Sequence, residues 1–225
     1  MRLAAVGVAL VLTTLRPTAP PQAPQILTGT IRGRVRVPDT AAAAAARPSV
    51  GELSGGDHPT VDRRRSVVYL DKVPLGAFDE LPAGRVRMDQ RAEMFVPRVL
   101  AITVGTIVDF PNSDSKFHNV FSLSKTHPFD LGRYPPGKTG FQRFSRPGLV
   151  RVFCDIHSHM SGFILVFSHP YFNVTDVDGR YLIPNVTAGA YTLMLWSELG
   201  AAEPRRITVA EGAATEVDFQ VGRAR

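Results

Sequence analysis

Two apolar runs frame a short polar loop in the stretch Leu149-Val150-Arg151-Val152-Phe153-Cys154-Asp155-Ile156-His157-Ser158-His159-Met160-Ser161-Gly162-Phe163-Ile164-Leu165-Val166-Phe167. Each run has the length and the β-branched and aromatic content of a strand, so the stretch predicts a strand, a turn and a second strand. Many further short apolar runs, together with 18 Pro and 19 Gly in 225 residues, extend this pattern along the chain. We therefore predict an all-β fold made of sandwiches.

The loop between these two runs carries candidate metal ligands. Cys154 is the only cysteine of the chain, and His157 and Met160 follow it at intervals of three. Residues three apart in a tight turn return to the same side of the chain, so the three side chains can point at one place. His118 can complete the set from a neighbouring loop. A thiolate, two imidazoles and a thioether are the ligands of a blue-copper centre.

Copper suits this mixture for a physical reason. The soft thiolate binds Cu(I), the imidazoles suit both oxidation states, and a long thioether contact avoids the square geometry that Cu(II) prefers. We therefore predict one type 1 copper ion bound by His118, Cys154, His157 and Met160. Alone, each residue has an ordinary interpretation, such as a buried cysteine or a core methionine. His159 is a rival for His157, but its spacing favours the outer face of the loop, and its contribution stays open.

A family resemblance covers the segment from Val86 to Phe167, which resembles a small cupredoxin. Its upstream half, Phe95–Asp114, is similar to the plastocyanin pattern that precedes the first histidine ligand, and the ligand loop is similar in length to that of amicyanin. The resemblance implies a Greek-key β-sandwich over residues 83–168. It also implies that His118, Cys154 and His157 are strong ligands and that Met160 is the weak axial ligand.

The resemblance further implies a role for Asn119. In such proteins the residue after the first histidine ties the two ligand loops together, and its backbone N–H points at the cysteine sulfur, which tunes the reduction potential. One departure from the family pattern stands out. Relatives often carry prolines inside the ligand loop, whereas this chain has Asp155, Ile156, Ser158 and His159 there, so the resemblance leaves the potential open.

The C-terminal third has a separate pattern. Two alternating runs, Phe172–Ile183 and Asn185–Trp196, are joined through Asp-Gly and Ala-Gly turns. This part resembles the carboxypeptidase regulatory-like, or transthyretin-like, β-sandwich module. The resemblance implies a second, smaller β-sandwich.

Such a module normally begins with strands resembling Gly29–Val37 and Ser66–Leu70, and here both precede the cupredoxin segment. We therefore predict a nested chain, in which residues 27–75 and 169–225 are the two halves of the smaller sandwich and residues 83–168 are inserted between them. A tandem order is the alternative. The Ala- and Gly-rich residues 38–60 predict a flexible loop.

The N-terminus predicts export. Arg2 is followed by the apolar stretch Leu3–Leu15 and then by a Pro- and Ala-rich segment, which is the outline of a signal peptide over residues 1–23. Ala23 is the best candidate for the cleavage position, and an uncleaved anchor is the alternative. The expected location is periplasmic or extracellular, where ligation to copper would explain a lone cysteine in an oxidising compartment.

Charge gives a hint about partners. The net charge is +6, and seven Lys or Arg against three acids lie between Pro111 and Met160. A positive metal end would speed docking to an acidic redox partner. No aromatic residues interleave with the basic ones as a stacking platform, so we expect no nucleic-acid binding. Peripheral association with a membrane redox complex and the oligomeric state stay open.

The functional prediction is an exported type 1 copper protein that carries single electrons between redox partners and is not an enzyme. Three alternatives remain. The first is a copper carrier or storage module with the same ligands, and the second is a structural or binding β-sandwich protein with a vestigial copper site. The third is a thiol enzyme with a Cys154 and His118 pair, which would leave His157 and Met160 unexplained.

Overall fold

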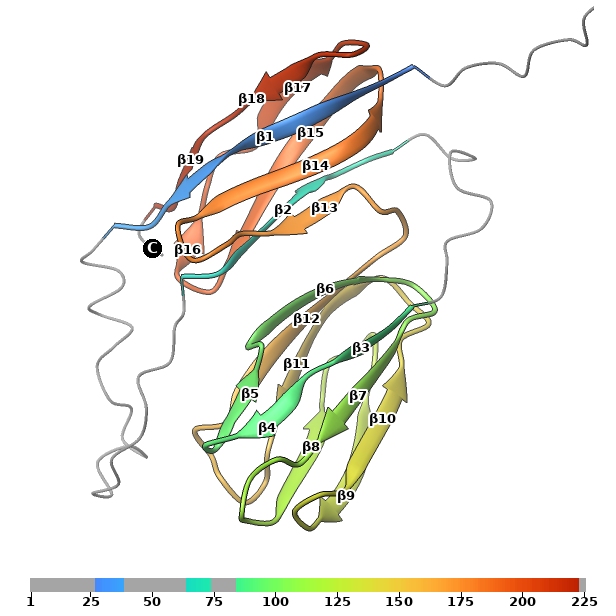
Figure 1. Cartoon of the computed structure of the whole chain (residues 1–225), viewed down its shortest axis with the longest axis vertical. Coiled ribbons are helices and arrows are strands. Elements are labelled where there is room, and N and C mark those ends of the chain that lie inside the picture. Colours follow the sequence, from blue (N-terminus) through green and yellow to red (C-terminus); the bar gives the residue numbers. More distant parts are fainter. Residues whose placement is uncertain (1–26, 39–63, 74–83, 223–225) are drawn as a thin grey trace, which may run out of the picture.

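The computed structural model describes residues 27–38, 64–73 and 84–222. Every regular element of this part of the chain is a β-strand. Figure 1 shows that these strands form two sandwiches, one above the other in this view. The prediction of an all-β chain built from two sandwiches is therefore confirmed. The predicted signal peptide lies outside the described residues, as does the predicted flexible loop apart from Pro38. In the part of the chain that the structure describes, no helix has the length and apolar character needed to cross a membrane.

The lower sandwich in Figure 1, here called the central sandwich, consists of residues 84–167. One sheet has the order β6-β12-β11-β8-β9, a second has the order β10-β7-β3, and β4 and β5 form a hairpin. The strands are β3 (Arg85–Arg87), β4 (Asp89–Arg91), β5 (Met94–Val96), β6 (Val99–Thr103), β7 (Ile107–Pro111), β8 (His118–Ser122), β9 (Phe129–Tyr134), β10 (Thr139–Arg143), β11 (Gly148–Phe153) and β12 (Ser161–Phe167).

The core of the central sandwich follows from strand alternation. On β7, Val108 and Phe110 point inward, and on β11, Val150 and Val152 do the same, because successive side chains of a strand face opposite sides. Cys154 and Met160, at the two ends of the predicted ligand loop, belong to the same buried cluster. The candidate site is therefore built onto the core rather than onto a free loop.

The upper sandwich, here called the composite sandwich, consists of residues 27–38, 64–73 and 171–222 (Figure 1). Its strands are β1 (Thr28–Arg36), β2 (Ser66–Leu70), β13 (Phe172–Val174), β14 (Arg180–Thr187), β15 (Gly189–Ser197), β16 (Gly200–Ala201), β17 (Arg205–Val209), β18 (Ala214–Glu216) and β19 (Phe219–Gln220). β1 pairs antiparallel with β14 and parallel with β18 and β19, while β2 lies between β13 and β15.

This pairing decides how the chain is organised. Both N-terminal strands pair with strands from the C-terminal third, so the central sandwich is an insertion between the two halves of the composite sandwich. The resemblance of the composite sandwich to the regulatory-like module stays a prediction.

The two sandwiches meet through an apolar interface around β12. Phe163 and Leu165 of β12 form a buried cluster with Val67 of β2 and Val99 of β6, and Trp196 of β15 packs on Phe163 with ring centroids 5.0 Å apart. The other face of β12 contributes to the core of the central sandwich. Because both faces are covered, β12 reads as a continuous apolar run without alternation.

Two buried histidines hold loops remote from the predicted ligands. His127 Nε2 accepts the backbone N–H groups of Ser145 (2.9 Å) and Arg146 (3.3 Å), and His169 Nδ1 accepts the N–H of Tyr171 (3.2 Å). Burial lowers the pKa of both imidazoles below their ordinary value. Folding therefore favours the neutral form of both imidazoles.

We expect the free energy of unfolding to fall as the pH is lowered below about 6.5, the ordinary pKa of histidine. At His127 and His169 the unfolded chain takes up protons in this range while the folded protein does not, so these two residues make acid favour the unfolded state until their lower folded pKa values are reached. Denaturant titrations at about pH 7.5 and about pH 5.5 measure this loss. His127→Gln, which keeps an acceptor for both N–H groups, should reduce it; an unchanged loss would show that His127 does not contribute.

Candidate metal centre

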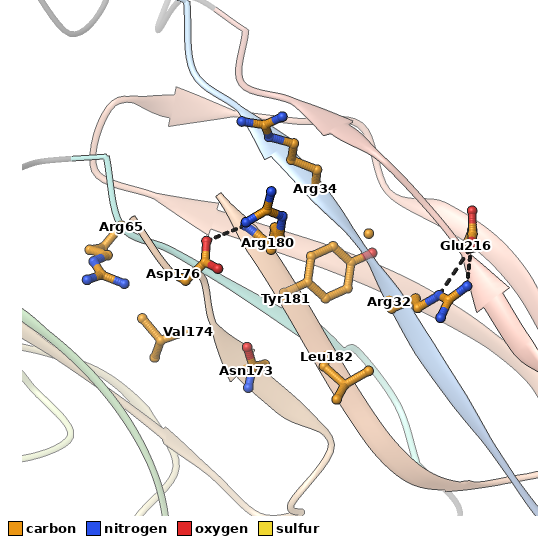
Figure 2. Close-up of a pocket in the computed structure, with 11 residues that line it drawn as sticks. Arg32, Arg34, Arg65, Asn173, Val174, Asp176, Arg180, Tyr181, Leu182 and Glu216 are labelled. Atoms are coloured by element: carbon orange, nitrogen blue, oxygen red, sulfur yellow. Dashed lines mark hydrogen bonds and ion pairs between the residues drawn. The ribbon is translucent and has the colours of Figure 1, made fainter. Parts of the chain in front are cut away.

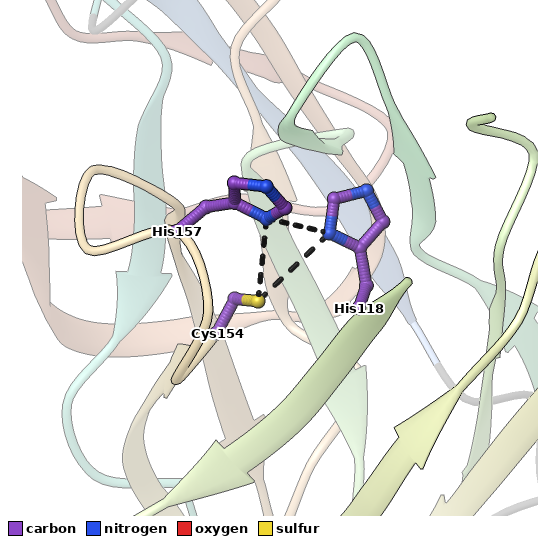
Figure 3. Close-up of side chains that lie close together, drawn as sticks. All are labelled: His118, Cys154 and His157. Atoms are coloured by element: carbon purple, nitrogen blue, oxygen red, sulfur yellow. Dashed lines mark hydrogen bonds between the residues drawn. The ribbon is translucent and has the colours of Figure 1, made fainter. Parts of the chain in front are cut away.

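Three of the four predicted ligands lie where the strands of one sheet of the central sandwich begin or end. β8 and β11 are antiparallel neighbours, so the first residue of β8 and the last residue of β11 lie at the same end of the strand pair. His118 is the first residue of β8, Cys154 follows β11 directly, and His157 lies in the turn that leads to β12. Figure 3 shows the three side chains pointing toward one another.

The donor atoms of these three residues converge. Cys154 Sγ lies 3.8 Å from Nδ1 of His118 and 3.8 Å from Nδ1 of His157, and the two Nδ1 atoms are 3.0 Å apart (Figure 3). Within the described residues, this is the cluster whose ligand atoms could hold a metal ion. His118 is fully buried and Cys154 is 4% exposed, while His157 is partly exposed. One sulfur and two imidazole nitrogens in this arrangement match the strong ligands that copper needs.

The ligand loop is closed by its own backbone. The Met160 N–H donates to the His157 carbonyl (2.9 Å), and the Cys154 N–H donates to the Met160 carbonyl (3.4 Å). These bonds return Met160 to the base of the loop, where its side chain is 1% exposed in the same core cluster as Cys154. The structure thus places Met160 beside the site, and its role as the axial ligand stays a prediction.

The surroundings of Cys154 favour its thiolate form. Burial works against ionisation, but hydrogen bonds from the His118 imidazole and from the backbone N–H groups of Asn119, His157 and Ile156 prevail, so the pKa of the Cys154 thiol lies below its ordinary value. The thiolate is the form of cysteine that binds metals. The folded protein therefore favours the ionised form of the Cys154 sulfur, which is the form that can coordinate a metal.

Asn119 makes the backbone contact that the resemblance implied. Its N–H donates to Cys154 Sγ at 3.5 Å. Its side-chain amide, however, donates to Asp130 of β9 at 3.1 Å. The side chain thus ties β8 to β9 rather than to the loop that carries Cys154, and Asn119 contacts that loop through its backbone N–H.

Asp114 was not predicted from the sequence, yet it contacts the candidate site. Its Oδ2 accepts a hydrogen bond from His118 Nε2 at 3.0 Å and another from the Glu93 N–H at 2.7 Å. Although burial opposes it, these hydrogen bonds lower the pKa of the Asp114 carboxyl. A carboxylate on the remote nitrogen fixes the ring and its tautomer, so that Nδ1 is free to face the sulfur. An acid four residues before His118 was the available signal.

Glu93 was also missed, and it corrects the expectation for His159. Glu93 and Ala92 form the two-residue turn of the β4–β5 hairpin, both with positive φ (54° and 52°). The Glu93 carboxylate forms an ion pair with Lys116, and its Oε2 lies 3.2 Å from His159 Nε2. His159 was expected on the outer face of the loop, but its side chain is only 16% exposed and faces this carboxylate. It remains outside the converging set.

A groove of about 680 Å³ lies on the composite sandwich and is shown in Figure 2. Its lining includes four arginines. Arg32 and Arg180 form ion pairs with carboxylates, whereas Arg34 and Arg65 donate to backbone carbonyls of the loop before β14. No histidine or cysteine lines this groove, so among the described residues the metal-ligand chemistry belongs to the central sandwich.

No family model matches the chain, and no curated protein matches it. Among solved structures, a purple cupredoxin from Nitrosopumilus maritimus is similar at 23% identity, with a TM-score of 0.34, over 36% of this chain and 99% of that one. The Cu(I) form of a single-residue variant of amicyanin is similar at 20% identity, with a TM-score of 0.36, over 39% of this chain and 87% of that one.

A copper-containing nitrite reductase from Thermus scotoductus SA-01 is also similar, at 29% identity and with a TM-score of 0.35. The match covers 42% of this chain and 25% of the reductase. This chain thus spans about a quarter of the length of that enzyme.

Proposed function

We propose that this chain is a cupredoxin-type protein that binds one type 1 copper ion and carries single electrons. The observation that carries the proposal is the convergence of Cys154 Sγ with Nδ1 of His118 and of His157, all within 4.8 Å of one another. Bound copper would supply the Cu(II)/Cu(I) couple. His118, Cys154 and His157 would hold it, with Met160 as the weak axial ligand.

The protein residues would set the properties of this centre. Asp114 orients His118 from behind, and the Asn119 N–H reduces the negative charge on the Cys154 sulfur. His118 and Cys154 are buried, so the partly exposed His157 is the edge through which an electron would enter or leave. The burial of His118 and Cys154 also gives a substrate little access, which supports a carrier rather than an enzyme.

The surface near His157 supports docking to a redox partner. Phe117 and Ile156, the residues that precede the two histidine ligands, are exposed apolar side chains (55% and 40%). Lys116 and Arg133 form ion pairs with Glu93 and Asp155, which weakens the positive field that the sequence predicted. An acidic redox partner and export to the periplasm or to the extracellular space are further parts of the proposal.

Copper addition tests the proposal directly. Purified protein is mixed with Cu(II), and the visible and electron paramagnetic resonance spectra are recorded. We expect an intense blue charge-transfer band and a narrow copper hyperfine splitting. A colourless product with wide splitting would contradict a type 1 centre. Rapid loss of Cu(I) to a competing chelator would instead favour the copper carrier.

For Met160→Leu, we expect copper binding to persist and the reduction potential to rise, because the axial thioether stabilises Cu(II) and leucine has no donor atom. A redox titration of the loaded protein measures the shift. Met88→Leu is the matched control, since Met88 is a fully buried methionine of the same core that lies outside the ligand loop. Equal potentials for Met160→Leu and the wild type would exclude Met160 from the centre.

A further inference from the structure

Arg98 lies between the two sandwiches and binds a carboxylate of the composite sandwich. It precedes β6, and its side chain is only 10% exposed. Its Nε donates to Glu198 Oε2 at 2.9 Å and its Nη2 donates to Oε1 at 2.7 Å. Glu198 itself is 14% exposed and sits in the turn between β15 and β16. The pair is thus bidentate and largely shielded from water, unlike the ion pairs on the outer surface.

The same guanidinium also holds the end of the ligand loop. Arg98 Nη1 donates to the Ser161 carbonyl at 2.5 Å, and Nη2 donates to Ser161 Oγ at 3.1 Å. The group lies over the ring of Phe163, 5.4 Å from its centroid. Ser161 follows Met160 directly and is the first residue of β12. A continuous chain of contacts therefore leads from Glu198 through Arg98 to the residue beside Met160.

We propose that Glu198 and Arg98 are positioning residues through which the composite sandwich fixes the ligand loop of the metal centre. Within the loop, the closing bond between the Cys154 N–H and the Met160 carbonyl is long (3.4 Å) and therefore weak, so a further anchor beside Met160 would restrain the loop. Arg98 supplies that anchor at Ser161. Without Glu198, the charge of Arg98 would be buried without compensation. The guanidinium would then turn toward water and release Ser161.

The test uses the full-length, metal-free protein. In Glu198→Gln, we expect the backbone amide of Met160 to exchange hydrogen about tenfold faster or more than in the wild type, relative to the amides of β7. Arg98→Lys should act in the same direction, because an ammonium lacks the planar fork that binds Glu198 and Ser161 together. Glu216→Gln is the matched control: it breaks an exposed Arg–Glu pair of the composite sandwich and should leave Met160 unchanged.

Two outcomes would overturn the proposal. One is an unchanged exchange rate at Met160 in Glu198→Gln. The other is an equal acceleration of hydrogen exchange at amides throughout the central sandwich, which would mean that the Arg98–Glu198 pair only stabilises the fold. One part of the proposal rests on the proposed function. In the copper-loaded protein, Glu198→Gln should also shift the reduction potential, whereas Glu216→Gln should not. A wild-type protein that takes up no copper would refute the copper function, while the exchange experiment would still decide the positioning role.

Discussion

In the Cys154→Ser variant, we expect the visible charge-transfer band of the copper-loaded protein to disappear completely. The band requires a copper–thiolate bond, and Cys154 is the only cysteine of the chain. A serine hydroxyl is a hard donor that stays protonated at neutral pH, so it cannot replace the soft thiolate. The fold should survive, because Oγ can accept the Asn119 N–H that Sγ accepts now. The expected cost in stability is about 1–2 kcal/mol.

Copper titration followed by visible spectroscopy measures the loss, and circular dichroism of the same sample checks the fold. His159→Gln is the matched control. This residue lies in the same loop, but its Nε2 faces Glu93, so the variant should keep the band. A band of full strength in Cys154→Ser would mean that the sulfur does not bind the metal. Loss of the band in His159→Gln alone would move His159 into the ligand set.

Gly33→Ala should strongly destabilise the composite sandwich. A Cβ atom at this position of β1 would lie 1.8 Å from the Val217 carbonyl oxygen and 3.0 Å from the Tyr181 hydroxyl oxygen. Both neighbours are fixed, since the Tyr181 hydroxyl donates to that same carbonyl and the Val217 N–H donates to Arg32. The backbone of β1 must therefore separate from the segment between β18 and β19. We expect a loss of about 3 kcal/mol or more.

Denaturant unfolding followed by tryptophan fluorescence measures this effect, because Trp196 is the only tryptophan and lies on β15 of the composite sandwich. Gly84→Ala is the matched control: a Cβ atom there would meet its nearest neighbour, Thr106, at 3.9 Å, and the change should be within about 1 kcal/mol. Equal stability of Gly33→Ala and the wild type would contradict the place of β1 in this sandwich.

The sequence was most informative where one strand pair carried both the apolar pattern and the reactive side chains. The runs on either side of Cys154 predicted β11 and β12, and the loop spacing predicted the meeting of Cys154 and His157. His118 could be added because the imidazole and the thiolate belong to one ligand chemistry. These inferences needed only local geometry and the preferences of a metal.

Other features depend on contacts that a linear sequence conceals. The turn that presents Glu93 has two residues with positive φ but lacks the Asn-Gly or Asp-Gly signal of such turns. Arg98 and Glu198 are distant in sequence, and charged residues are usually solvated. The apolar run of β12 predicted a strand. It did not predict that the composite sandwich covers the second face of this strand.

The covered second face of β12 also fixes how the candidate site faces relative to the composite sandwich. The buried cluster of Phe163, Leu165, Val67 and Val99 fixes the orientation of one sandwich against the other. His157 is therefore aimed in a direction set by the composite sandwich. A surface that bound the composite sandwich would therefore also set the direction in which His157 faces, and with it which other proteins could reach this residue.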